Sequence, residues 1–160
     1  DMKPVSDYKE KSIGEFYGVY YGQSALDLEC DEIRYLTNSE IENCTVYNHD
    51  PSAEAKKVKV YDELKLDSDD RYDFYLSGAS SVIEIINPAG AGIKGRELVV
   101  FRDSFGSSLT PLLLSGYEKV TLIDTRYIYP EMISEYVTFD GQDVLFIYST
   151  MSINSSKTLR

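Results

Sequence analysis

The chain has 160 residues and a formal net charge of −11, from 16 lysines and arginines against 27 aspartates and glutamates. With 42% hydrophobic residues it can bury one core of ordinary domain size, which argues against intrinsic disorder and against a two-domain enzyme. The acidic balance disfavours nucleic acid as a partner, because nucleic-acid affinity comes largely from lysine and arginine. The longest apolar runs, 112–114 and 144–147, are far shorter than the roughly 20 residues of a membrane helix, so no membrane insertion is expected.

The chain begins with Asp1 and shows no charged segment followed by an apolar one, so we expect it to be cut from a longer protein. Its two cysteines, Cys30 and Cys44, do not have the spacing of a redox or zinc motif, and no metal or other cofactor is expected. In an exported protein they could close a disulfide loop of about 15 residues, worth on the order of 3 kcal/mol. Two buried thiols are the favoured alternative.

Residues 1–90 have the pattern of short, half-exposed antiparallel strands separated by turns rich in Asn, Asp, Ser and Pro. The segments concerned are rich in aromatic and β-branched residues or alternate with period two. We expect strands at 16–21, 32–36, 45–47, 57–61 and 81–86.

Residues 91–160 alternate buried strands with helical segments, which is typical of parallel βαβ units and predicts an α/β fold. The predicted strands are 98–101, 120–124 and 144–148, and the predicted helices are 109–114 and 130–137. Pro111 is then expected in the first turn of its helix, and Gly116 is expected to end that helix. Three parallel strands cannot stand alone, so the antiparallel half or a missing segment must complete the sheet.

Polar residues follow each of the three predicted parallel strands, where ligands gather in open α/β sheets. Asp103 and Ser104 follow the first strand, Asp124 and Arg126 the second, and Ser149 the third. A serine at a strand-to-helix turn has an exposed hydroxyl, and its own N–H points toward a developing oxyanion. The alternative is that Ser104 only caps the helix.

Three segments, 70–78, 98–105 and 120–127, resemble in order and spacing the C-terminal part of the bacterial DHHW proteins. That family belongs to the SGNH-hydrolase-like group, which also contains the acetyltransferase-like proteins of alginate export. The resemblance extends from about residue 16 to about residue 148. It implies a three-layer, flavodoxin-like α/β/α sheet and a Ser-His-Asp site for acyl-ester chemistry on a cell-envelope glycan. It also implies an extracytoplasmic location behind an N-terminal membrane anchor.

By this resemblance Ser104 matches the nucleophile, and its backbone N–H would be one oxyanion donor. Two positions depart from the pattern: Arg102 stands where a glycine commonly precedes Asp-Ser, and Ala79 stands where relatives often have an asparagine. The Asp-His-His-Trp motif that supplies the base in these relatives is absent here, and so is any tryptophan. The only histidine, His49, is expected in an exposed turn.

Other candidate sites are weaker. We expect Asp103 to order the turn, and we consider Arg126 and Asp124 as substrate-binding residues, with their mutual pairing as the favoured alternative. The acidic loop at 67–73 has the carboxylate density of a calcium site but not its pattern, so a solvated loop is favoured. Tyr17, Tyr20 and Tyr21 could stack on sugars, although aromatic residues in short strands more often pack in the core.

The leading hypothesis is that residues 1–160 are the C-terminal part of a cell-envelope esterase or O-acyltransferase that acts on an acylated polysaccharide. An upstream segment of the same protein would supply the Asp-His pair, so this part alone is expected to be inactive. The alternative is a non-catalytic module on the same fold that binds a glycan or another envelope component. Intact-protein labelling of Ser104 separates the two.

Overall fold

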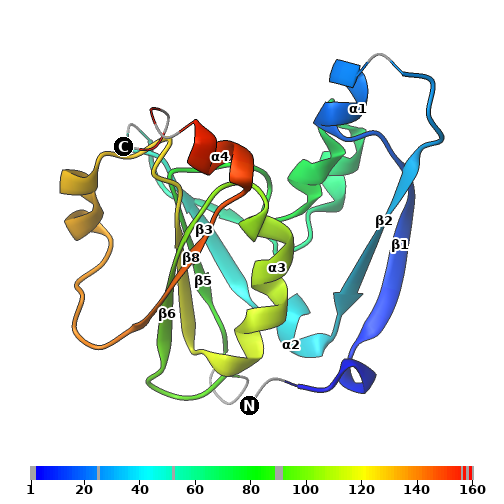
Figure 1. The fold of residues 1–160 in the computed structure, drawn as a ribbon. Coiled ribbons are helices and arrows are strands. Elements are labelled where there is room, and N and C mark those ends of the chain that lie inside the picture. The colour runs from blue at the N-terminus through cyan, green and yellow to red at the C-terminus, as the bar shows by residue number, and fades with distance from the viewer. Residues whose placement is uncertain are drawn as a thin grey trace.

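The computed structural model describes residues 3–24, 26–51, 53–88, 92–155, 157 and 159. It is a mixed α/β structure with a two-stranded sheet and a six-stranded sheet (Figure 1). The strands are β1 (Lys9–Phe16), β2 (Asp31–Thr37), β3 (Thr45–His49), β4 (Lys56–Val58), β5 (Val82–Ile86), β6 (Glu97–Arg102), β7 (Lys119–Ile123) and β8 (Asp143–Ile147). The α-helices are α1 (Val19–Ser24), α2 (Ser39–Glu42), α3 (Gly106–Leu113) and α4 (Thr150–Asn154). The 3-10 helices are η1 (Val5–Asp7), η2 (Glu63–Asp67), η3 (Arg71–Phe74), η4 (Leu114–Gly116) and η5 (Pro130–Glu135).

The six-stranded sheet combines strands from both parts of the chain in the order β4-β3-β5-β7-β6-β8. β6 pairs in parallel with β7 and with β8, while β5 is antiparallel to both β7 and β3. The predicted parallel strands are thus confirmed, and the antiparallel strands do extend their sheet. Because β3 runs in the same direction as β7, the carboxyl ends of β3, β6, β7 and β8 share one edge.

Alternate residues of the central strands supply hydrophobic clusters on opposite faces of the sheet. The cluster toward α3 and η4 includes Ile83, Val100, Leu114 and Leu122, all at most 1% exposed. The cluster toward η5 includes Val82, Val99, Ile123, Ile133 and Val137. Figure 1 shows yellow-green α3 and orange η5 on opposite sides of the sheet. Each such buried aliphatic side chain contributes about 1.5–3 kcal/mol, so the central strands are fixed firmly.

Two sequence-based expectations about secondary structure are wrong. The segment 16–21 is not a strand, because β1 ends at Phe16 and α1 starts at Val19. The rings of Tyr17, which precedes α1, and Tyr21, within it, lie 4.9 Å from each other. Pro111 is the sixth residue of α3 rather than part of its first turn, since this helix begins at Gly106.

Two other predicted segments are confirmed with changes. The segment 130–137 is helical, but it forms the 3-10 helix η5 rather than an α-helix. The strand predicted at 57–61 is shorter, since β4 covers only Lys56–Val58. Gly116 is the last residue of η4, which continues directly from α3. The helical segment therefore ends at Gly116, as the sequence predicted.

β8 is the last strand of the sheet and has no neighbour on its outer side within the described ranges. Its side chains Val144 and Phe146 are 46% and 67% exposed. Phe146 stacks on Phe101 of β6 with ring centroids 4.8 Å apart. In α/β sheets such apolar side chains are normally covered by helices. No helix in the described part of the chain combines the length and apolarity that crossing a bilayer requires.

Candidate functional site

The site lies at the shared carboxyl edge, where an ion cluster is built on the end of β7. Asp124 is fully buried, and the Arg126 guanidinium donates to both of its oxygens, with Nε–Oδ1 at 2.9 Å and Nη2–Oδ2 at 2.7 Å. The backbone N–H of Arg126 also donates to Oδ1 at 3.1 Å. The expected pairing is therefore formed, and the Asp124 carboxylate is not open to a ligand. This carboxylate raises the pKa of Arg126, which stays cationic.

Arg102 at the end of β6 is also fully buried, and its Nη1 lies 3.7 Å from Asp124 Oδ2. Burial lowers the pKa of Arg102, and the Asp124 charge opposes that shift. The Nε and Nη2 atoms of Arg102 have no hydrogen-bond partner among the described residues. The side chain runs beneath Gly106, where an added Cβ would lie 2.7 Å from the Cβ of Arg102. Close packing at this turn is thus provided by a glycine after the serine.

Asp103 ties two of the loops at this edge together. Its Oδ1 accepts the Phe105 N–H at 3.1 Å, and its Oδ2 accepts the Ser149 N–H and the Ser152 hydroxyl, both at 2.7 Å. Burial raises the pKa of Asp103, but the hydrogen bonds from Ser152 and Ser149 outweigh it and hold the pKa below its usual range. The ionised carboxylate therefore fixes the turn after β6 against the start of α4.

Ser104 is half-buried and lines a small cleft of about 240 Å³ together with Arg126 and Ser152. Its hydroxyl has no hydrogen-bond partner in the described part of the chain. Helix α3 is capped at Phe105 without a side-chain hydrogen bond, so Ser104 does not act as its cap. The Tyr72 hydroxyl donates to the carbonyl of Ser104 at 3.1 Å, which holds the backbone of this residue in place.

Arg126 is the cation that reaches the same cleft, with its side chain 25% exposed. Its fork is already fixed on Asp124, so little side-chain freedom would be lost when it meets a ligand. In a cleft that holds both a hydroxyl and a fixed guanidinium, the guanidinium can stabilise the oxyanion that forms on a carbonyl oxygen when the hydroxyl attacks its carbon. Asp124 orients that guanidinium through the two hydrogen bonds that it accepts from it.

His49 does not lie in an exposed turn, which corrects the expectation from the sequence. It is the last residue of β3 and is half-buried. Its ring packs against Tyr136 with centroids 5.6 Å apart, and its Nε2 lies 4.0 Å from Glu84 Oε2. These contacts are on the η5 side of the sheet, whereas Tyr72 links Ser104 to Ser108 of α3 at 2.9 Å. No described contact brings His49 to Ser104.

The weaker candidates are placed as follows. Cys30 and Cys44 are half-buried free thiols, and burial raises the pKa of Cys44 to about 12. In the acidic loop, Asp70 caps η3 by accepting the Tyr72 N–H at 2.9 Å. No group of three metal-ligating side chains occurs within the described ranges. The side chain of Tyr20 lies outside them.

Two residues of the site have roles that the sequence did not reveal. Tyr72 belongs to the 70–78 segment that carries the family resemblance, but nothing in its neighbourhood indicated a contact with Ser104, because the two are 32 positions apart. Ser152 lies three residues after Ser149, the polar residue that follows β8. Ser149 is the N-cap of α4, and its Oγ accepts the Ser152 N–H at 3.2 Å. A serine at an N-cap position with a second serine three residues later is a sequence signal that could have placed both serines at the start of a helix.

No family model and no curated protein matches the sequence. Solved structures do match its fold. A DHHW family protein from Eubacterium siraeum superposes with a TM-score of 0.70 at 23% identity, over 94% of this chain and 50% of that one. Bacillus cereus PatB1 superposes with a TM-score of 0.67, at 18% identity for a structure with a sulfonyl adduct and 17% for one described without it. These two matches also cover 94% of this chain, and 50% and 52% of PatB1. The chain thus shares a fold with a DHHW family protein and PatB1, and spans about half the length of each.

Proposed function

We propose that this chain carries the nucleophile of a cell-envelope SGNH-like esterase or O-acyltransferase that acts on an acylated polysaccharide outside the cytoplasm. The observation that carries the proposal is the Ser104 hydroxyl, which caps no helix and lines the same cleft as Arg126. Asp103 fixes the turn around it through three hydrogen bonds. The fold likeness to PatB1 supports it, because a sulfonyl adduct requires a nucleophilic group in that protein.

The chemistry follows from the positions of these groups. Ser104 Oγ attacks the acyl carbon while a base removes its proton, and the carbonyl oxygen becomes an oxyanion. The Ser104 N–H and the Arg126 guanidinium stabilise that oxyanion. The glycan oxygen then leaves with the proton, and an acyl-serine remains. Water or a second hydroxyl attacks the acyl-serine, gives its proton to the base and releases Ser104.

The base comes from outside the described residues in this proposal, and the open edge of the sheet indicates where its segment would lie. The order β7-β6-β8 corresponds to three neighbouring strands of a flavodoxin-like sheet, in which two more strands lie beyond the third. Those strands would pair with β8, and the structures that share this fold are about twice as long. An upstream segment with an Asp-His pair would thereby complete both the three-layer sheet and the Ser-His-Asp site.

The test is hydrolysis of an acetylated glycan by a form of the protein that includes the upstream Asp-His-His-Trp region. Ser104→Ala should reduce kcat at least a thousandfold, because the nucleophile is lost. Ser134→Ala, an exposed serine of η5, should leave kcat unchanged. Full activity of Ser104→Ala would end the proposal.

A second function is favoured by one feature, the absence of any described contact between Ser104 and a base. A non-catalytic module would keep the buried Arg102–Asp124–Arg126 cluster for structure alone and bind a glycan or an envelope protein through the cleft. Binding of the acetylated glycan without turnover by the longer form, at a level that Arg126→Met abolishes, would establish this function instead.

A further inference from the structure

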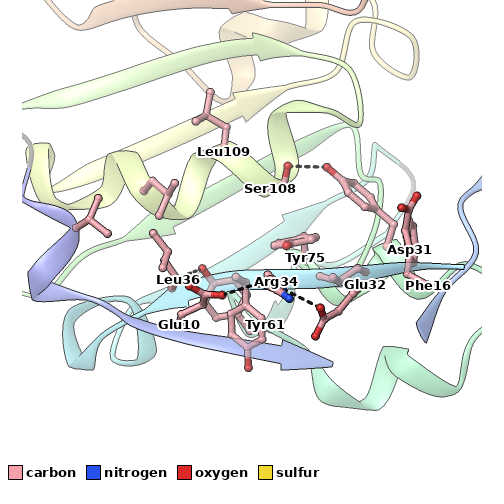
Figure 2. Close-up of a pocket in the computed structure, with 15 residues that line it drawn as sticks. Glu10, Phe16, Asp31, Glu32, Arg34, Leu36, Tyr61, Tyr75, Ser108 and Leu109 are labelled. Carbon is pink, nitrogen blue, oxygen red and sulfur yellow. Dashed lines mark hydrogen bonds and ion pairs between the residues drawn. The ribbon is translucent and has the colours of Figure 1, made fainter. Parts of the chain in front are cut away.

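A second and larger hollow lies between β2 and α3, and Ser104 is not among the residues that line it. This groove has a volume of about 790 Å³. One wall is formed by the six consecutive residues 31–36 of β2, and the other includes Ser108, Leu109 and Leu112 of α3 (Figure 2). Side chains of consecutive strand residues point to opposite faces, so a groove that contacts all six must border the edge of the strand.

That edge of β2 is unpaired within the described part of the chain, because β2 is bonded only to β1. The carbonyl of Leu36, which lies opposite Glu10 of β1, instead accepts the Tyr61 hydroxyl at 2.7 Å. A carbonyl that accepts from a side chain outside the ladder is expected to point away from the partner strand. Since backbone groups of an antiparallel strand alternate in direction, the N–H and C=O of Arg34 and Glu32 point to the same open side. Such an edge is a template for another strand.

The groove also offers an apolar surface for the side chains of such a strand. Tyr35 and Tyr75, which line the groove, are 8% and 6% exposed, and both lie near the ring of Tyr61, at 4.6 Å and 6.0 Å between centroids. On the facing wall Leu109 of α3 is 40% exposed. An extended chain in the groove would cover Leu109 and, with alternate side chains, contact the tyrosines.

The charges of the groove favour a basic occupant. Its lining carries three acids, Glu10, Asp31 and Glu32, and one base, Arg34, so its net charge is 1 − 3 = −2. Arg34 is paired with Glu10 at 3.6 Å and with Glu32 at 2.7 Å. Asp31 has no partner among the described residues. A lysine or arginine of the occupant would meet an acid that nothing else neutralises.

We propose that this groove binds an extended peptide segment of another protein, with alternating apolar and basic residues, as a third strand of the β1–β2 sheet. Six residues of edge are about 20 Å long, the length of an ordinary strand. Main-chain hydrogen bonds to Glu32 and Arg34 supply affinity, while Leu109 and Asp31 select the side chains. The proposal does not depend on Ser104 or on any catalytic activity.

The test uses a fluorescein-labelled peptide, Lys-Val-Lys-Val-Lys-Val, and fluorescence anisotropy with the 160-residue chain. Two further peptides carry N-methyl groups on the odd or on the even residues. We expect one of the two to bind at least tenfold more weakly, because only one set of N–H groups faces β2. Replacing the lysines with glutamates should weaken binding at least tenfold, because of Asp31.

Matched variants of the chain place the peptide in the groove. Leu109→Gln and Asp31→Asn should each weaken binding at least threefold, whereas Leu64→Gln and Asp69→Asn, exposed residues that do not line the groove, should not. NMR should show amide shifts at Glu32 and Arg34. Equal binding of all the peptides would overturn the proposal. So would a result in which chitohexaose binds to the chain and the peptide does not.

Discussion

Two charged clusters of the molecule have similar chemistry and opposite surroundings. At the carboxyl edge of the six-stranded sheet one carboxylate, Asp124, meets two guanidinium groups, and the carboxylate is fully buried. On the two-stranded sheet one guanidinium, Arg34, meets two carboxylates on an exposed surface. Separating a buried ion pair leaves charges that no water solvates, whereas water solvates the partners of an exposed pair. The buried cluster therefore holds its side chains in fixed geometry, and the exposed cluster does not. The following predictions test that difference.

The largest effect is expected from Asp124→Ala. The change leaves the buried Arg102 without its ion-pair partner and frees Arg126, which should cost about 3–5 kcal/mol of unfolding free energy. Urea denaturation followed by circular dichroism measures it. Asp69→Ala, an exposed acid, is the control and should have little effect. A loss for Asp124→Ala as small as that of the control would show that the cluster does not contribute as described.

Asp103→Asn should cost about 1.5–3 kcal/mol at neutral pH, because charge-assisted hydrogen bonds from Ser149 and Ser152 are weakened. The pH dependence is the sharper readout. The folded pKa of Asp103 is lowered, so its contribution is present above the unfolded value of about 3.9 and is lost as the pH falls through the folded value. The wild type and the variant should therefore converge in urea stability at acid pH. A constant difference down to the acid transition would contradict the lowered pKa.

Gly106→Ala should destabilise the chain by about 1–3 kcal/mol, the usual cost of inserting a methyl into a packed site. The new Cβ would meet the Cβ of Arg102 at 2.7 Å, so the helix start or the arginine must move. Gly116→Ala is the matched control, because an added Cβ there has no neighbour within 4 Å. Thermal unfolding of both variants makes the comparison, and equal melting temperatures would mean that Arg102 does not pass beneath Gly106.

The smallest effect is expected from Arg34→Ala on the two-stranded sheet. Its ion pairs with Glu10 and Glu32 are exposed and screened by salt, so the urea midpoint should not shift measurably. A shift comparable with that of Asp124→Ala would remove the contrast between the two clusters.

Much of the fold at the site could be predicted from the sequence, because its strands follow strong rules. Val99 and Leu122 belong to short apolar runs that end in polar residues, and such runs are typical of buried parallel strands. The same rule placed Ser104 and Arg126 at one edge. The strands of that edge then brought both residues to the same cleft.

Other features depend on contacts between distant residues, which no local pattern contains. The hydroxyl of Tyr61 bonds to Leu36, 25 positions away, and helps to form a groove that the sequence did not indicate. Arg102 stands where a glycine was expected for close packing at the turn, but Gly106, the first residue of α3, provides the space. His49 stands within the turn-like sequence 47–51, yet it pairs with Val82 of β5 as the last residue of β3.

The most direct test of the central claim is intact-mass analysis after treatment with a fluorophosphonate, followed by peptide mapping. It compares this chain with a form extended upstream, in which the proposed Asp-His pair would lie. We expect an adduct on Ser104 in the extended form and none in the 160-residue chain, because the proposed base belongs to the added segment. The absence of an adduct from both forms, or an adduct on another residue, would contradict the assignment of Ser104 as the nucleophile.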